Sequence, residues 1–346
     1  MSDTYLFHTL EALCTTVGVN GMTPIAVLVK TLLKPYTEDI TEDCNGNIFA
    51  TIPAADANAP VLLLEAHMDE IGFVVTGVEE NGFLRVSPCG GVDLRCLAAA
   101  PVVVWGKTAL AGVFCSTPPH LLEKAEEEKA TPADKLFVDI GMSAAAAKET
   151  VRIGDRVSFA ENFVVVRDDT LVTSKALDNR AGVAAILYAL YLLDMDALPY
   201  TLKILFACGE ELGCRGATPG AFASDADAAI ITDVSFAFTP DAPRALCGDL
   251  SHGVMVGISP TLDSQFSDTL QQLAQKNDIP FQLEVVGGKT GTDADAISIA
   301  KSGIRCALLS TPLRYMHTPV EMVDLQDVRA VGELMAAFVR EAALHA

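Results

Sequence analysis

The stretch LLLEAHMDEIGFVV, residues 62–75, begins as an apolar β-strand and then places four ionisable side chains within six residues. A short continuous apolar run is typical of a strand buried on both faces, as in a parallel sheet. Open α/β sheets place their ligand sites at the carboxyl ends of their strands. We therefore expect His67 and Asp69 to reach a functional site, whereas this pattern assigns no role to Glu65 and Glu70.

Three more apolar runs of similar length predict the rest of this sheet, and they lie at 202–208, 228–231 and 305–309. Helical patterns accompany them at 180–193, about 261–276, about 294–301 and 325–344. Strands that alternate with helices build layered α/β folds with right-handed crossovers. The expected fold class is therefore α/β, with a mixed, largely parallel sheet flanked by helices.

The middle of the chain has a different sequence pattern. Strand-sized pieces broken by turn residues fill it, such as NGFLRVSPCGG at 81–91 and VRIGDRVSFAENFVVV at 151–166. We expect a small β-rich domain at 73–163, inserted into a discontinuous α/β domain formed by 1–72 and 164–346. The charged stretch LLEKAEEEKATPADK at 121–135 is expected to be a solvated loop or short helix.

Composition limits the classes of function. Of 346 residues, 50% are hydrophobic and 20% are charged, which suits an enzyme-sized globular chain. The net charge of -21 would repel nucleic acid and anionic membranes, so we expect neither as a partner. No apolar run reaches membrane-spanning length, and no basic secretion signal begins the chain. Nine cysteines without a C-x-x-C pair fit a reducing compartment, and the expected location is the cytoplasm.

Charged residues follow the predicted strands and precede one predicted helix. They are His67 and Asp69, Asp178, Glu210 and Glu211, Asp233, and His317. Buried like charges repel one another and are costly to desolvate, so such a group requires a cation. Mixed nitrogen and oxygen ligands suit zinc, cobalt or manganese. The sequence therefore predicts a metal site at one edge of the sheet.

Five of these residues suffice for two metal ions. If the ligands are His67, Asp178, Glu211, Asp233 and His317, one carboxylate can bridge a pair of ions, as in hydrolytic two-metal centres. Glu210 is then left over, and it is placed to take a proton from an activated water and pass it to a leaving amine. Singly, each residue has an ordinary structural explanation, such as a helix cap for Asp178 or a turn for Asp233. Jointly, they favour the metal site.

Eight sequence motifs are spread along nearly the whole chain. In order they are AHMDEIGFVV, GGVDLRCL, DIGM, KALDNRAG, GEELGCRGA, TDVS, GTDADA and RYMHTPVEMV. In this combination the chain resembles the co-catalytic two-metal aminopeptidases related to glutamyl aminopeptidase and to the tetrahedral (TET) aminopeptidases, some of which carry the name endoglucanase. One departure is VNGMTPIAV at 19–27, where that family commonly has a PSG-x-E-like turn.

The resemblance implies a role for each matched position. His67 and Asp233 would hold one ion, Glu211 and His317 would hold the other, and Asp178 would bridge them. Asp69 would orient His67, and Glu210 would be the general base. His120, Asp293 and Arg314 match positions near the substrate, where a structural role is equally open. The inserted domain would mediate a homo-oligomer built from dimers, up to a dodecamer.

The expected function is hydrolysis of amino-terminal residues from short peptides by a metal-dependent aminopeptidase, with two zinc or cobalt ions, or manganese. A related carboxypeptidase, dipeptidase or deacylase is the alternative, because such enzymes use similar ligands. A carboxypeptidase needs a cation for the terminal carboxylate, which Arg95, Arg215 or Arg314 could supply. A non-catalytic assembly protein would not need Glu210. Glycoside hydrolysis by two carboxylates needs no metal, which disfavours a glycosidase.

Overall fold

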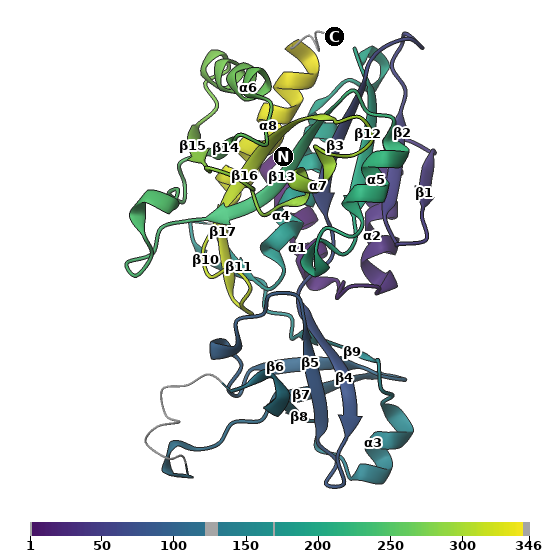
Figure 1. Ribbon diagram of the computed structural model, residues 1–346, viewed down its shortest axis with the longest axis vertical. Coiled ribbons are helices and arrows are strands. Elements are labelled where there is room, and N and C mark those ends of the chain that lie inside the picture. The colour runs from purple at the N-terminus through teal and green to yellow at the C-terminus, as the bar shows by residue number, and fades with distance from the viewer. Residues whose placement is uncertain (1, 122–130, 169, 342–346) are drawn as a thin grey trace.

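The computed structural model describes residues 2–121, 131–168 and 170–341. Its larger part is built around an eight-stranded sheet, and a small β-barrel lies at the opposite end of the molecule (Figure 1). The strands of the large sheet follow one another in space as β1 (Ile40–Glu42), β2 (Ile48–Ile52), β12 (Thr201–Ala207), β3 (Val61–His67), β13 (Ala228–Phe236), β16 (Arg305–Leu313), β14 (Val254–Ile258) and β15 (Phe281–Val285). The four central strands pair in parallel, and antiparallel pairs flank them. This confirms the α/β fold class with a mixed, largely parallel sheet.

Helices cover both faces of this sheet. One face carries α1 (Ser2–Thr15), α2 (Thr23–Leu33), α4 (Leu177–Leu192), α6 (Ser264–Lys276) and α8 (Leu325–Glu341), and the other carries α5 (Ala217–Ser224) and α7 (Asp293–Ile297). Side chains alternate between the two faces along a strand, so Leu62 and Leu64 pack in the core beneath α4, whereas Leu63 packs beneath α5. Burial on both faces explains the continuous apolar runs within these strands.

Several elements differ in length from the sequence-based expectation; β16, for example, runs to Leu313 rather than to residue 309. The helix α7 ends at Ile297 rather than near residue 301. Strand β13 runs to Phe236 rather than to residue 231, because it pairs residue for residue with β16 as far as Phe236 and Leu313. Asp233 therefore lies inside a strand. Its polar neighbours Thr232 and Ser235 hide this extension from a reading based on apolar runs alone.

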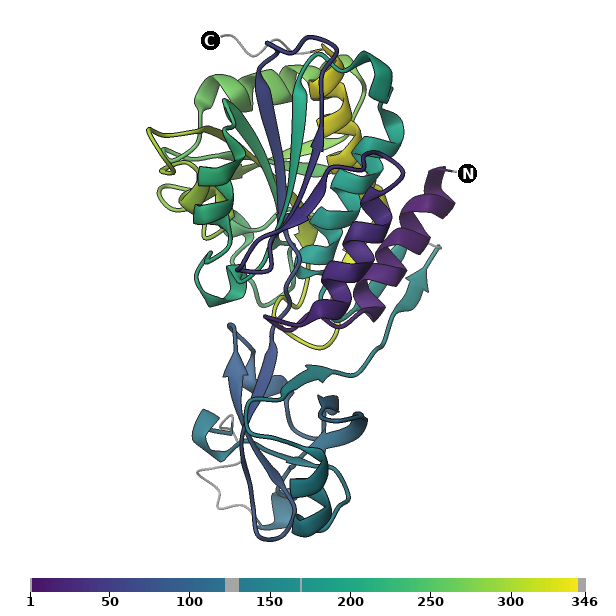
Figure 2. The same ribbon diagram turned by 90° about the vertical axis from the view of Figure 1, so that its right-hand side faces the viewer.

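The barrel occupies the middle of the chain. Its strands close in the order β4 (Gly72–Val78), β5 (Leu84–Cys89), β8 (Phe137–Asp139), β7 (Ala109–Phe114), β6 (Pro101–Trp105) and β9 (Arg156–Phe159), and α3 (Ala144–Thr150) packs beside them (Figure 2). Phe73, Phe114 and Phe159 meet at its centre, with the Phe73 ring 4.7 and 5.6 Å from the other two. The barrel therefore has a core of its own. Most of the acidic stretch at 121–135 lies outside the described residues.

A third, three-stranded sheet joins β10 (Val164–Arg167), β11 (Leu171–Ser174) and β17 (Glu321–Asp324). Short 3-10 helices occur at η1 (Leu94–Cys96), η2 (Pro119–Leu121), η3 (Ala133–Lys135), η4 (Met195–Ala197), η5 (Glu210–Leu212) and η6 (Arg244–Leu246). Among the described residues, no helix combines the length and the apolar character that a membrane crossing requires.

Candidate metal centre

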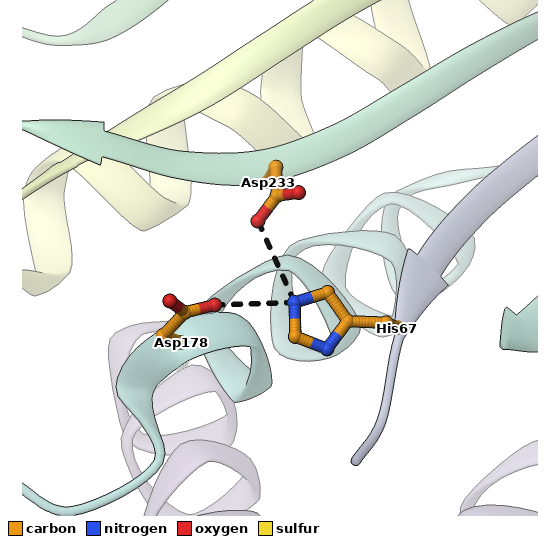
Figure 3. Close-up of side chains that lie close together, drawn as sticks. All are labelled: His67, Asp178 and Asp233. Atoms are coloured by element: carbon orange, nitrogen blue, oxygen red, sulfur yellow. Dashed lines mark hydrogen bonds and ion pairs between the residues drawn. The ribbon is translucent and has the colours of Figure 1, made fainter. Parts of the chain in front are cut away.

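His67 is the last residue of β3, and its side chain is buried at the carboxyl end of the sheet. Its Nε2 lies 3.1 Å from Asp178 Oδ1 and 3.7 Å from Asp233 Oδ1 (Figure 3). Asp178 comes from the first turn of α4, and Asp233 comes from β13, the strand next to β3 in the sheet. Three elements distant in sequence therefore direct their polar groups at one point.

Asp178 faces two imidazoles with its two oxygens. Oδ1 is directed at His67, and Oδ2 lies 3.3 Å from Nε2 of His317. Burial would raise the pKa of Asp178, but the hydrogen bonds from the two histidines lower it below its usual value. A carboxylate with one oxygen toward each of two ligand groups has the arrangement that a bridging ligand requires.

His317 follows β16 and completes a second group with Glu211. Its Nε2 is 3.5 Å from Glu211 Oε1, and its Nδ1 is 2.9 Å from the carbonyl oxygen of Gly91. When Nδ1–H donates to that carbonyl, Nε2 presents its lone pair to the carboxylates, as a metal-binding histidine does. Each of the groups His67–Asp178–Asp233 and Asp178–Glu211–His317 has ligand atoms within 4.8 Å of one another. The structure thus brings all five proposed ligands together, and either group could hold a metal ion.

The electrostatics of the cluster show an excess of negative charge. Burial raises the pKa of Glu211 to about 8, and the charge of Asp178 adds to this shift. Burial alone would lower the pKa of His317, but its hydrogen bond to Asp178 and the charge of Glu211 raise it to about 10. Both shifts show that this site favours added positive charge, whether as protons or as a cation.

Asp69 supports the turn that carries Glu210. Its Oδ1 accepts hydrogen bonds from the backbone N–H groups of Gly209 at 2.8 Å and Glu210 at 3.2 Å, and it lies 3.6 Å from Nδ1 of His67. Gly209 has φ of 88°, and a Cβ there would lie 2.8 Å from the Asn20 side chain, so glycine fits this turn. Through these hydrogen bonds, Asp69 connects the end of β3 to the turn that follows β12.

Glu210 borders the cluster and the cavity beside it. Its Oε2 is 3.9 Å from Nε2 of His67, while Glu211 next to it is directed at His317. Burial raises the pKa of Glu210 to about 8. The two adjacent glutamates thus face different parts of the site, as separate roles for them require.

Glu321 is a supporting residue that the sequence-based reasoning missed. Its buried carboxylate accepts hydrogen bonds from the backbone N–H groups of Asp178 at 3.0 Å and His317 at 2.8 Å. It thereby fixes the backbone at two proposed ligands at once. The only signal for it in the sequence is an acidic residue in an otherwise apolar stretch, between Val320 and Met322.

A second pair of buried carboxyls, Glu65 and Asp293, lies beside the cluster. Burial and the neighbouring Asp293 raise the pKa of Glu65 well above its usual value, and burial raises the pKa of Asp293 to about 6. Asp293 also lies within 4.8 Å of Glu210 and Cys214, measured between ligand atoms. Of the three residues expected near the substrate, Asp293 therefore lies beside Glu210, the expected general base.

The other two residues expected near the substrate have different surroundings. His120 is exposed in η2, in the middle part of the chain that forms the barrel. Arg314 donates from Nε to the carbonyl oxygen of Phe238 at 2.9 Å. Among the described contacts, none joins His120 or Arg314 to the metal-ligand cluster.

A cavity of about 460 Å³ opens onto the cluster. Its walls include His67, Asp178, Glu210, Asp233 and His317. A larger hollow of about 670 Å³ lies between α1 and α8, and its lining contains none of these residues. The smaller cavity is therefore the candidate active site, because proposed metal ligands and the carboxylate of Glu210 line the same space.

Comparisons with known proteins point to one family. The family model for M42 glutamyl aminopeptidases matches residues 46–334. A lysyl aminopeptidase of Pyrococcus furiosus is 32% identical over 330 residues, which cover 94% of each chain. The structure of an aminopeptidase from the archaeon Desulfurococcus kamchatkensis superposes with a TM-score of 0.92 at 30% identity, over 99% of this chain and 96% of that one. The TET1 peptidase of Pyrococcus horikoshii superposes with a TM-score of 0.85 at 28% identity, over 97% and 100%.

The α/β fold and the acidic cluster with its two histidines place the protein in the class of peptide hydrolases. More narrowly, the chain belongs to the M42 glutamyl aminopeptidase family. The resemblance inferred from the eight motifs is thereby confirmed.

Proposed function

We propose that this protein is a two-metal aminopeptidase that releases amino-terminal residues from short peptides. The observation that carries the proposal is the position of Asp178, whose two oxygens face His67 and His317. In this proposal His67 and Asp233 hold one ion, Glu211 and His317 hold the other, and Asp178 is shared. The ligand types suit zinc or cobalt, with manganese as an alternative.

Glu210 is the proposed general base. When bound, two divalent ions would lower the pKa of a water molecule and polarise the scissile carbonyl. Glu210 lies beside the proposed ligands without belonging to either group, so its carboxylate is free to accept the proton from water and return it to the leaving amine. Asp69 holds the backbone of Glu210 in place through its hydrogen bond to that N–H.

The cavity favours an aminopeptidase over a carboxypeptidase. Among the described residues that line it, there is no lysine or arginine to hold a terminal carboxylate. Two of the three arginines considered for that role bond elsewhere: Arg95 pairs with Asp93 at 2.7 Å, and Arg314 bonds to Phe238. A substrate amine, by contrast, would find an environment rich in carboxylates.

We further propose that the chain works in the cytoplasm as a homo-oligomer built from dimers, up to a dodecamer, and that residues 73–163 mediate this association. Support comes from the TET1 peptidase of Pyrococcus horikoshii, which assembles into a tetrahedron or a large octahedral shell. A small barrel that contributes none of the five proposed ligands also suits a role in assembly. Short peptides are the proposed substrates.

A substrate panel tests the activity. The purified protein, loaded separately with zinc, cobalt and manganese, is offered aminoacyl anilides, the same anilides with an acetylated amine, and peptides blocked only at the amino end. An aminopeptidase should cleave the free-amine anilides and leave the blocked ones intact. Cleavage of blocked peptides from the carboxyl end, or release of the acetyl group, would instead indicate a carboxypeptidase or a deacylase.

A further inference from the structure

The cavity beside the metal-ligand cluster contains an acidic group that the proposed chemistry does not use. Glu284, on β15, lines the same cavity as His67 and Glu210. It belongs to neither group of proposed ligands. Glu284 is partly buried, and a desolvated carboxylate is costly unless it has polar partners, so its presence in a substrate cavity raises the question of what it binds.

Two serine hydroxyls hold Glu284 in position. Ser235 donates to Oε1, and Ser310 donates to Oε2 at 2.6 Å. Ser235 lies two residues after Asp233 on β13, and Ser310 is the register partner of Asp233 on β16. The carboxylate is therefore fixed next to the strand that carries a proposed ligand. Each of its oxygens still has acceptor capacity, because a carboxylate offers about four lone-pair sites.

Apolar side chains line part of the cavity that Glu284 borders. Phe236, Leu246, Leu283 and Val285 line the same cavity, and each keeps a large exposed fraction, between 49% and 70%. Such a wall suits the hydrocarbon stem of a long side chain, while a cationic end can reach the carboxylate. The lining contains no lysine or arginine among the described residues, so an acidic side chain would have no counter-charge there beyond the metal centre.

We propose that this cavity selects substrates whose amino-terminal residue is basic, with Glu284 as the residue that binds the ammonium or guanidinium group. The inference rests on the proposed aminopeptidase function and adds the substrate class to it. Hydrogen bonds to charged groups are stronger than neutral ones, and a site built around a charge rejects neutral isosteres. Lysine and arginine should therefore be preferred to methionine, whose unbranched side chain is one atom shorter than that of lysine and carries no charge, and glutamate should be poorest.

The test compares kcat/KM for lysyl, arginyl, methionyl and glutamyl anilides with metal-loaded protein. The variants are Glu284→Gln, which removes the charge at the wall, and Asp241→Asn, which changes net charge equally at an exposed position. We expect the wild type and Asp241→Asn to favour lysyl over methionyl substrate by about 10- to 100-fold. Glu284→Gln should lose most of that preference, measured as the ratio of lysyl to methionyl kcat/KM of the same variant.

The outcomes separate this inference from the function beneath it. Equal rates on lysyl and methionyl anilides, or a preference that Glu284→Gln leaves intact, would overturn the assignment of Glu284 while the aminopeptidase function stands. A complete lack of turnover on every free-amine anilide would overturn both. If Glu284→Gln does not fold, the ratio of lysyl to methionyl activity in the wild type decides, and a ratio near one would contradict the proposal.

Discussion

At the scale of single residues, neighbours in the sequence face different parts of this site. Glu210 and Glu211 are adjacent, yet Glu210 lies 3.9 Å from His67 while Glu211 lies 3.5 Å from His317. A tight turn after Gly209 makes this divergence possible. Replacing Glu210 should therefore remove only the proposed general base, whereas replacing Glu211 should remove a proposed metal ligand. Metal content distinguishes the two losses.

Glu210→Gln should retain metal and fold while losing most turnover, because it removes the proton acceptor without removing a ligand. General acid–base assistance is typically worth about 10²- to 10⁴-fold in rate. The matched control is Glu211→Gln, which should lose metal as well as activity. Metal content and kcat are measured on both variants. Loss of metal from the Glu210 variant with full retention in the Glu211 variant would reverse the two roles.

A second residue-scale prediction concerns Glu70. Its Oε2 lies 2.7 Å from Nζ of Lys175, its Oε1 accepts from the backbone N–H of Gly18 at 2.6 Å, and both charged side chains are buried. Glu70→Gln would leave the Lys175 charge without its partner, and breaking a buried pair typically costs about 3–5 kcal/mol. Urea unfolding of the metal-loaded protein measures the loss.

The control for that experiment is Glu79→Gln. Glu79 lies 2.6 Å from Arg85 in a partly exposed pair on the barrel. Exposed pairs are typically worth about 0–1 kcal/mol, so this variant should unfold almost as the wild type does. A Glu70 variant within about 1 kcal/mol of the wild type would show that the buried pair contributes no more than a surface one.

At the scale of elements, the four central strands of the large sheet were predictable from their apolar runs, whereas its outer strands were not. β3 begins with the apolar run at 61–64, which predicted both the strand and the place of His67 at its end. β15 alternates between partly buried and exposed residues, so its pattern is weak, and Glu284 was not recognised as a wall of the cavity. The extension of β13 depends on pairing with β16, which no local pattern encodes.

Supporting residues were the least predictable part of the site. The five proposed ligands could be selected from the sequence because each follows an apolar run or stands at the start of a predicted helix. Glu321 bonds to the backbone of Asp178 across 143 residues of sequence, and Glu65 meets Asp293 from another part of the chain. Such contacts arise only when the sheet is assembled. Their residue types alone do not distinguish them from ordinary surface acids.

The helix α8 offers a pH prediction. Asp327, in its first turn, accepts hydrogen bonds from the backbone N–H groups of Gly253 at 2.6 Å and Ser251 at 2.7 Å. Burial nevertheless raises the pKa of Asp327 from 3.8 to about 7. Between these values the native state holds a proton that the unfolded chain has lost, so the contribution of this group to stability should fall as pH rises.

The variant Asp327→Asn isolates that contribution. The unfolding free energy of the wild type minus that of the variant should decrease from about pH 4 to about pH 7 and level off above, because only the wild type titrates there. Parallel stability curves for the two proteins would show that Asp327 has an ordinary pKa in the native state.

At the scale of the whole molecule, the barrel stands at one end (Figure 2), and none of the five proposed ligands lies on its strands. We predict that the full-length, metal-loaded protein forms a large homo-oligomer, which would leave the catalytic sites accessible to short peptides. Light scattering coupled to gel filtration measures its mass, with metal present because bound ligand stabilises the native form. A mass near 36.6 kDa at every concentration would contradict assembly, and a mass of two chains would leave only the dimer.

The central claim is that Asp178 bridges two metal ions, and metal counting tests it most directly. The wild type and Asp178→Ala are each titrated with zinc or cobalt, freed of excess ion, and analysed for bound metal per chain. The geometry of the two overlapping groups predicts two equivalents for the wild type and a clear loss of bound metal for Asp178→Ala. Saturation of the wild type at one equivalent, with Asp178→Ala unchanged from it, would contradict the account.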